Sequence, residues 1–91
     1  MSEGGPWKII IHRKAENILK RLDGDALNRV RQSIRDLGVE PRPMGCKKLT
    51  GYEDLYRVRV GDWRIIYAIQ DDRLIVLVLE IATRGGAYRD L

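Results

Sequence analysis

The sequence has very little cysteine and histidine. Cys46 and His12 are the only residues of either kind among 91. A single cysteine cannot form an internal disulfide, and one cysteine with one histidine is too few for a zinc site. We therefore expect no disulfide framework, no metal centre and no cofactor.

Long apolar runs are also missing. The longest, Leu74–Leu79, is far short of the ~20 residues needed to span a bilayer. The first residues, MSEGGPW, lack the apolar stretch of a signal peptide. We therefore expect a cytoplasmic protein without membrane contact, in which residues 1–6 are a disordered lead. Residues 7–91 are expected to form a single domain, because a chain this short has room for one core.

The charge is moderately positive. Lysine and arginine number 17 against 13 acidic residues, which gives a net charge of +4 and a pI near 9.5. This balance permits nucleic acid, an acidic protein segment or a membrane surface as partner. It is also ordinary for a small soluble domain, so charge alone selects none of these partners.

The stretch 55–81 organises the rest of the chain. Three runs rich in Val, Ile, Leu and Tyr are separated there by Gly61-Asp62 and Asp71-Asp72. Two-residue joints between apolar runs are typical of β-hairpins. The stretch predicts a three-stranded antiparallel meander, in which two-residue turns place Val60 opposite Trp63.

The same register places Gln70 opposite Arg73 and divides the strands into two faces. One face is apolar and is the expected core: Tyr56, Val58, Val60, Ile65, Tyr67, Ile69, Leu74, Val76 and Val78. The other face mixes arginines with apolar residues: Arg57, Arg59, Arg64, Ile66, Ala68, Ile75, Leu77, Leu79 and Ile81. Arg59 and Arg64 lie directly opposite each other there, and like charges in that position are destabilising. A sheet with this pair is expected to meet something anionic.

The amino-terminal half predicts one strand and two helices. The run WKIIIH over 7–12 reads as a strand that is buried on both sides or lies at a sheet edge. Apolar residues then recur at helical spacing over 14–23, where Gly24 ends the helix, and again after Asp25, a plausible N-cap, up to Gly38. We therefore expect an α+β fold, in which an antiparallel pair of helices packs on the apolar face of the carboxyl-terminal meander.

Basic and aromatic residues flank the meander. The segment 39–51 has too many prolines and glycines for a regular element and ends in the basic residues Lys47 and Lys48, whose distance from the arginines stays open. Because antiparallel neighbours reverse direction, Arg84 is expected near Arg59 and Arg64, with Tyr88 one turn further on. Guanidinium groups bind phosphate bidentately and tyrosine can stack on an unpaired base. These residues predict a phosphate-binding face, although exposed arginines on a sheet can also be merely solvated.

Two further expectations concern the arginine face. No carboxylate falls on it in the predicted register, so the usual general acid and base are missing. Its apolar residues Ile66, Leu77, Leu79 and Ile81 would form a hydrophobic strip of several hundred Å², which soluble monomers rarely expose. We expect the first strand and the tail, or another chain, to cover this strip.

The run KLTGYEDLYRVRVGDWRIIYAI, followed by an apolar strand and R-x-x-x-Y, resembles the RelE/ParE superfamily of toxins from toxin–antitoxin pairs. The resemblance covers most of the chain, including the order of strand, two helices, basic loop and meander. Its RelE branch implies a ribosome-dependent endoribonuclease that inhibits translation. Such a toxin cuts messenger RNA in the ribosomal A site by attack of a ribose 2′-hydroxyl on the adjacent phosphate.

The resemblance also implies roles for individual residues. Arg59 would act as base or stabilise charge, Arg64 and Arg84 would hold the phosphate, and Tyr88 would stack on a base or transfer a proton. The first-strand positions are lysines in the best-known RelE pattern and arginines here, and a guanidinium is a poor general base. The other basic positions are expected to bind RNA: Arg57, Lys47 and Lys48.

Two alternatives stay open. The ParE branch shares the fold and implies a DNA gyrase inhibitor, and a catalytically silent antitoxin-binding module is the third reading. Retention of Arg64, Arg84 and Tyr88 favours RelE. Every reading implies a cognate antitoxin, whose acidic or amphipathic segment would cover the arginine face, and contact with operator DNA only through that complex. The RelE reading adds the ribosome and messenger RNA as partners.

Overall fold

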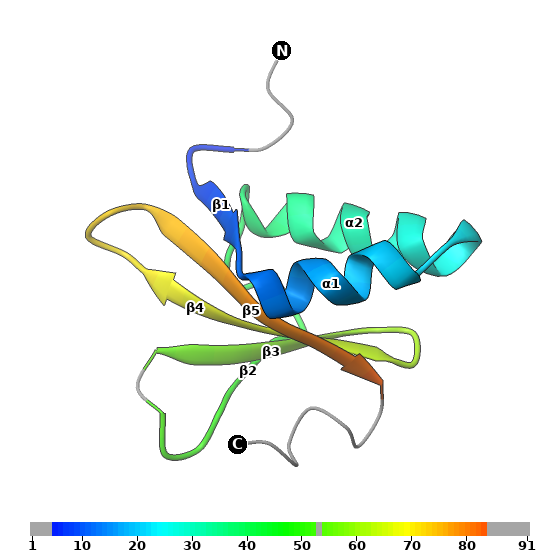
Figure 1. Ribbon diagram of the computed structural model, residues 1–91. Helices are drawn as coiled ribbons and strands as arrows, with labels where there is room; N and C mark the ends of the chain where they lie inside the picture. Colours follow the sequence, from blue (N-terminus) through cyan, green and yellow to red (C-terminus); the bar gives the residue numbers. More distant parts are fainter. Residues whose placement is uncertain (1–4, 53, 84–91) are drawn as a thin grey trace.

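The computed structural model describes residues 5–52 and 54–83, which form two helices and a five-stranded mixed sheet (Figure 1). The elements follow the order β1 (Lys8–Ile11), α1 (Arg13–Arg21), α2 (Gly24–Leu37), β2 (Lys47–Lys48), β3 (Leu55–Val60), β4 (Trp63–Gln70) and β5 (Ile75–Thr83). The strand order is β1-β5-β4-β3-β2, with β1 parallel to β5 and every other neighbouring pair antiparallel. The predicted α+β fold is confirmed.

The first strand lies at a sheet edge, one of the two places that its sequence allowed. β1 pairs only with β5, with Ile11 opposite Val78. The next residue, His12, caps α1, because its Nδ1 accepts a hydrogen bond from the Lys14 backbone N–H at 3.1 Å. The chain therefore passes directly from the edge strand into the helix layer.

The joint between the helices differs from the prediction by two residues. Asp23, not Asp25, is the N-cap of α2, and Gly24 is the first helical residue. Gly24 has a φ of +58°, which glycine adopts without steric cost, so the chain turns earlier than expected. Asp25 lies instead in the first turn, where its negative charge suits the positive end of the helix dipole.

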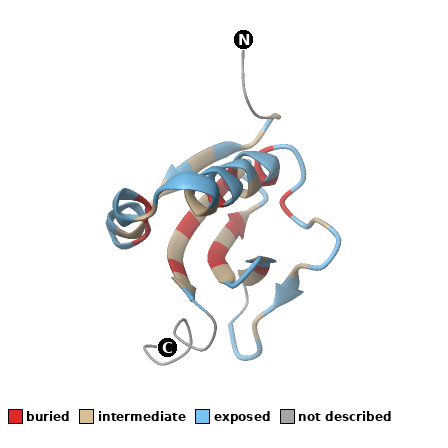
Figure 2. Cartoon of the chain, turned by 90° about the vertical axis from the view of Figure 1, so that its right-hand side faces the viewer, coloured by how far each residue is buried: buried red, intermediate tan, exposed pale blue. Residues whose placement is uncertain are grey.

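Both helices pack on the apolar face of the sheet, as predicted. Figure 2 shows buried residues on the helix sides that face the sheet and along the strands beneath them. The helix residues of this core are Ala15, Leu19, Val30, Ile34 and Leu37. The strand residues are Val58, Ile65, Tyr67, Ile69, Val76, Val78 and Ile81.

The turn between β4 and β5 is longer than predicted. It spans the four residues 71–74, so Gln70 pairs with Ile75 rather than with Arg73. A two-residue type I′ turn needs φ above zero at both positions, which Asp-Asp accommodates poorly. The structure places the positive φ, 56°, at Leu74 instead. Leu74, predicted in the core, is consequently 46% exposed.

A β-bulge in β5 corrects the predicted division of faces. Tyr67 pairs with Val78 but Ile66 pairs with Glu80, so β5 carries one extra residue, Leu79, at this point. The bulge reverses the alternation beyond it, and Ile81 therefore lies in the core at 1% exposure instead of on the arginine face. Periodicity in the sequence could not reveal this insertion.

The expected hydrophobic strip on the arginine face is not exposed. Ile81 belongs to the core, and Ile66 is only 1% exposed. Leu77 and Leu79 are half-buried, and none of the four belongs to the large exposed hydrophobic residues of the described chain. Of the two expected covers, the first strand and the tail or another chain, a second chain is therefore not required to keep these four side chains from solvent.

The described chain begins at Gly5, inside the expected lead of residues 1–6. Residues 1–4 of the expected lead lie outside the described residues, whereas a Cβ added to Gly5 would lie 2.7 Å from the Val39 Cα, so Gly5 contacts the end of α2 closely. In the described part of the chain, neither helix has the length and apolar character to cross a membrane.

Candidate functional site

A basic face lies on the side of the sheet away from the helices. Arg59 of β3 is the direct cross-strand partner of Arg64 of β4, as the sequence predicted. The next position on that face along β3, Arg57, pairs with Ile66. Gly61 makes the tight β3–β4 turn possible, since its φ is +64°. The hairpin therefore presents its arginines together beside one turn.

The two lysines that were predicted to bind RNA take different places. Residues 39–51 were expected to be a loop throughout, but the structure forms the short strand β2 within them. Lys47 pairs with Arg57, whereas Lys48 pairs with Tyr56 in the neighbouring row. Because paired residues share a face, Lys47 joins the arginines and Lys48 points with Tyr56 toward the other side. The basic face is thus Lys47, Arg57, Arg59 and Arg64, and all four are exposed or half-exposed.

The remaining predicted catalytic residues, Arg84 and Tyr88, lie outside the described residues. The last described residues end β5, where Ala82 pairs with Arg64 and Thr83 with Trp63. The described chain therefore ends beside the basic face.

The bulge in β5 also changes the position of one carboxylate, Glu80. The bulge in β5 places Glu80 opposite Ile66, in the same cross-strand row as Arg57. Its Oε1 lies 3.6 Å from the Lys14 Nζ of α1, so this carboxylate already has a cationic partner. Without the bulge, alternation would have turned Glu80 toward the core.

The residue types of the basic face suit an anionic ligand. Arginine stays protonated at physiological pH and donates paired hydrogen bonds to phosphate oxygens. Among residues 5–52 and 54–83, no group of three His, Cys, Asp or Glu side chains could hold a metal ion. Such a face can hold a phosphodiester and stabilise negative charge that develops on it.

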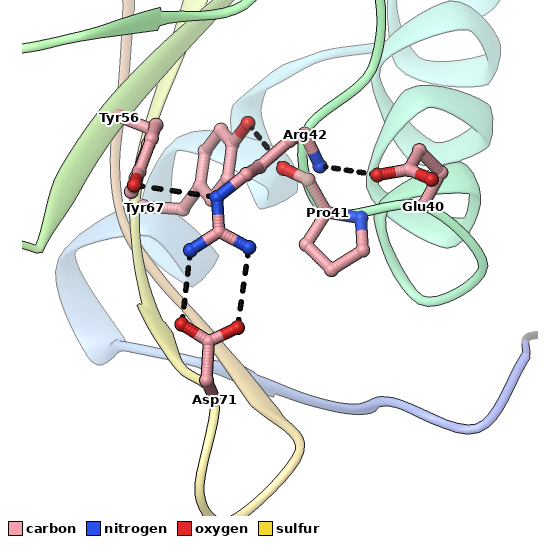
Figure 3. A network of polar contacts seen from close by, with 6 residues as sticks. All are labelled: Glu40, Pro41, Arg42, Tyr56, Tyr67 and Asp71. Atoms are coloured by element: carbon pink, nitrogen blue, oxygen red, sulfur yellow. Dashed lines mark hydrogen bonds and ion pairs between the residues drawn. The ribbon is translucent and has the colours of Figure 1, made fainter.

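A network of polar contacts holds the loop between α2 and β2, residues 38–46 (Figure 3). The Arg42 guanidinium donates two hydrogen bonds to the Asp71 carboxylate, at 3.2 and 2.9 Å, and one to the Tyr56 hydroxyl at 3.3 Å. It also lies over the Tyr56 ring, 5.2 Å from the centroid. These contacts join the loop to the β4–β5 turn. No local pattern pointed to Arg42, because its partners lie 14 and 29 residues away along the chain.

The same loop is tied to the core by Tyr67. Its buried hydroxyl donates a hydrogen bond to the Pro41 carbonyl oxygen at 2.8 Å. Burial, with a contribution from neighbouring Cys46, raises the pKa of the Tyr67 phenol, so the hydroxyl stays a hydrogen-bond donor across the physiological range.

The ion pair of the same loop shifts the pKa of both of its members. The pKa of Arg42 is raised mainly by its hydrogen bonds to Asp71, and Arg42 in turn lowers the pKa of Asp71. Pro41 and Arg42, which lie in the loop before Lys47, are thus held against the core and the β4–β5 turn.

A hollow of about 530 Å³ lies away from the basic face, between both helices and β1. Its aliphatic lining consists of Ile9, Ile11, Leu19 and Ile34. Charged side chains complete it: Glu16, Lys20, Arg31 and Arg35. This surface combines apolar side chains with a net positive charge, and the sequence analysis did not identify it.

Comparison with known proteins gives consistent results. The family model for the ParE toxin of the parDE type II toxin–antitoxin system matches residues 9–88. A protein of Methanocaldococcus jannaschii named as a RelE toxin is 31% identical over 92% of this chain and 97% of its own. The RelE toxin of Mycobacterium tuberculosis is 32% identical over 98% of this chain and 93% of its own.

The fold has solved counterparts as well. The RelE–RelB complex of Pyrococcus horikoshii contains a chain that superposes with a TM-score of 0.79 at 29% identity, covering 89% of this chain and 98% of the other. That protein was crystallised with its RelB partner. The matched family model, the named relatives and the shared fold agree with the motif around Arg59 and Arg64. The chain belongs to the RelE/ParE family of toxins of type II toxin–antitoxin systems.

Proposed function

We propose that this toxin is a ribosome-dependent endoribonuclease that cuts messenger RNA in the ribosomal A site and so inhibits translation. The observation that carries the proposal is the direct pairing of Arg59 with Arg64 on a face that also presents Arg57 and Lys47. Two guanidinium groups held opposite each other can donate hydrogen bonds to one oxyanion, and its negative charge offsets their mutual repulsion. A phosphodiester supplies such an oxyanion, and two relatives carry the name of RelE toxins.

In the proposed reaction, the ribose 2′-hydroxyl loses its proton and attacks the adjacent phosphorus, and the bond to the 5′-oxygen of the next nucleotide breaks. The 5′-oxygen takes up a proton, so the products are a 2′,3′-cyclic phosphate and a 5′-hydroxyl. Arg59 and Arg64 stabilise the charge that develops on the phosphorane oxygens, and the ribosome holds the attacking and leaving oxygens in line. Arg84 is assigned to the same phosphate, and Tyr88 to base stacking or proton transfer. Arg57 and Lys47 bind the RNA backbone on either side, and Lys48, in the neighbouring row, makes the smaller contribution.

The proposed protein partner is a cognate antitoxin, since the Pyrococcus horikoshii relative was crystallised with RelB. An acidic segment would neutralise the basic face and so block access of RNA. The apolar hollow between the helices and β1, with its net positive charge, offers the same partner a second surface. Contact with operator DNA would then arise only through the complex, in a cytoplasmic protein.

Inhibition of DNA gyrase is the second candidate, because the matched family model is that of the ParE toxin. The two functions are separated by testing the purified toxin in a reconstituted translation system and in a gyrase supercoiling assay. The proposal predicts new primer-extension stops inside codons that appear only with ribosomes, and unchanged supercoiling. Inhibited supercoiling without new stops would replace it by the ParE activity, and no effect in either assay would indicate a silent module.

A further inference from the structure

Arg29 of α2 lies against the β3–β4 turn, although it belongs to the helix layer. A Cβ added to Gly61 would meet the Arg29 Nη1 and Nη2 atoms at 3.4 Å and its Cζ at 3.6 Å. The guanidinium therefore rests on the one turn residue that has no side chain. The sequence analysis did not identify Arg29.

The position of Arg29 connects the helix layer with the basic face. Gly61 follows Arg59 by two residues and precedes Arg64 by three, and a strand rises about 3.3 Å per residue, so the Cα of Arg59 lies about 7 Å from the turn. The turn is also the end of the hairpin (Figure 1). A ligand that leaves the basic face past this end would pass beside Arg29.

The charge of Arg29 is not used within the described chain. Neither Arg29 nor Arg59 makes a hydrogen bond or ion pair with another residue in the ranges 5–52 and 54–83, and both are exposed. By contrast, the Arg42 guanidinium makes three side-chain hydrogen bonds. Close packing on the turn without a polar partner places a cation where it can bind an external anion.

We propose that Arg29, seated on Gly61, is a further RNA-binding residue, which contacts a backbone phosphate next to the phosphate held at Arg59 and Arg64. The inference rests on the proposed function and extends its binding surface around the end of the hairpin. The phosphate belongs to the messenger RNA or to ribosomal RNA close to the A site. Arg29 acts on binding, not on the bond that breaks.

The control variant comes from the same helix. Arg31 lies two residues further on, about 200° around the helix axis, and lines the hollow between the helices and β1. That hollow is proposed to bind the antitoxin and not RNA, and the assay below uses the toxin without antitoxin. Arg29→Ala and Arg31→Ala therefore remove the same charge from opposite sides of α2. A nonspecific effect of net charge would be equal in both variants.

Binding is measured over a salt series with two probes, a short single-stranded RNA with a 2′-O-methyl group at the cleavage position and ribosomes without messenger RNA. Affinity for RNA falls as the salt concentration rises. Loss of one phosphate contact makes the plot of log affinity against log salt concentration less steep, by about 0.7 in slope. Arg29→Ala should show this decrease with one probe, which identifies the source of the phosphate, while Arg31→Ala keeps the wild-type slope. Unchanged slopes for Arg29→Ala with both probes would overturn the proposal.

A second variant tests the packing of the Arg29 guanidinium against Gly61. Gly61→Asn tolerates the positive φ better than other substitutions. Its Cβ would already contact the Arg29 guanidinium at 3.4 Å, so we expect the amide group beyond the Cβ to displace the guanidinium from the turn. Gly61→Asn should weaken RNA binding in the wild-type background and have no further effect in Arg29→Ala, with thermal unfolding as the check on folding. Equal effects in both backgrounds would contradict the role of Gly61.

Kinetics separate this inference from the proposed function. In ribosome-dependent cleavage, Arg29→Ala should raise KM several-fold with kcat unchanged, because the contact forms equally in ground and transition states. If the wild type cuts and KM does not change, only the inference fails. If the wild type does not cut, the proposed function fails, and the two binding series still decide whether Arg29 binds phosphate.

Discussion

Lys47 of β2 and Arg57 of β3 are direct cross-strand partners. The pairing distinguishes Lys47 from its neighbour Lys48, which lies opposite Tyr56 in the next row. We predict that Lys47→Ala weakens RNA binding several-fold and lowers its salt slope by about 0.7, whereas Lys48→Ala has the smaller effect. Fluorescence anisotropy with a single-stranded RNA measures both variants. An equal loss of RNA affinity in the two variants would contradict the placement of Lys47, and not Lys48, on the basic face.

The bulge in β5 can be tested by stability. Ile81 lies in the core at 1% exposure, whereas Leu79, the extra residue of the bulge, is half-buried. Ile81→Ala should lower the free energy of unfolding by about 2–5 kcal/mol through lost burial and a cavity. Leu79→Ala should cost clearly less. Urea unfolding of both variants measures the difference. A cost for Ile81→Ala as small as that for Leu79→Ala would indicate the regular register instead, because that register places both residues on the arginine face.

The hydrogen bond from Tyr67 to Pro41 predicts a purely structural variant. Tyr67→Phe removes the hydroxyl and leaves a buried carbonyl oxygen without its donor. The free energy of unfolding should fall by about 1–3 kcal/mol. Tyr52→Phe, at an exposed position, is the matched control and should change stability little. Ribosome-dependent activity of folded Tyr67→Phe should persist, and its loss would show that the network has a more direct role.

The ion pair between Arg42 and Asp71 predicts a dependence on acid. Arg42 lowers the pKa of Asp71 from its ordinary value of 3.8. A carboxyl with a depressed folded-state pKa contributes stability above its unfolded value and loses this contribution as the pH falls through the folded value. The wild type should therefore lose stability more steeply below about pH 4 than Asp71→Asn.

Urea midpoints measured from about pH 6 to about pH 2.5 provide the test. Because the Asp71 carboxylate is largely exposed, the difference should be small and should shrink in high salt. Asp72→Asn, which removes a neighbouring aspartate outside this ion pair, should keep the wild-type slope. A slope for Asp71→Asn equal to that of the wild type would contradict a stabilising role of the pair.

Local patterns predicted the features that depend on local chemistry. The Gly61-Asp62 joint gave the β3–β4 register, and with it the pairing of Arg59 with Arg64. Helical periodicity gave the face that packs on the sheet. Alternation, by contrast, assumes that no residue is inserted, and so the bulge at Leu79 reversed the predicted places of Glu80 and Ile81.

Contacts between distant parts of the chain could not be predicted in the same way. Nothing in the run around Lys47 indicates that two residues add a strand beside Arg57, because the pairing depends on how the loop folds back. Arg42 and Arg29 were missed for the same reason, since the first meets Asp71 and the second Gly61 only in the folded chain. The roles of Arg84 and Tyr88, which lie outside the described residues, remain predictions.

The most direct test of the account is primer extension on messenger RNA in a purified translation system, with the wild type, Arg59→Ala, Arg64→Ala and a control. Arg73→Ala is the control, because Arg73 is an exposed arginine in the β4–β5 turn. The account predicts ribosome-dependent cuts inside codons for the wild type and Arg73→Ala, and a loss of about 100-fold or more in both other variants. Cuts that persist at the wild-type rate in folded Arg59→Ala and Arg64→Ala would contradict it.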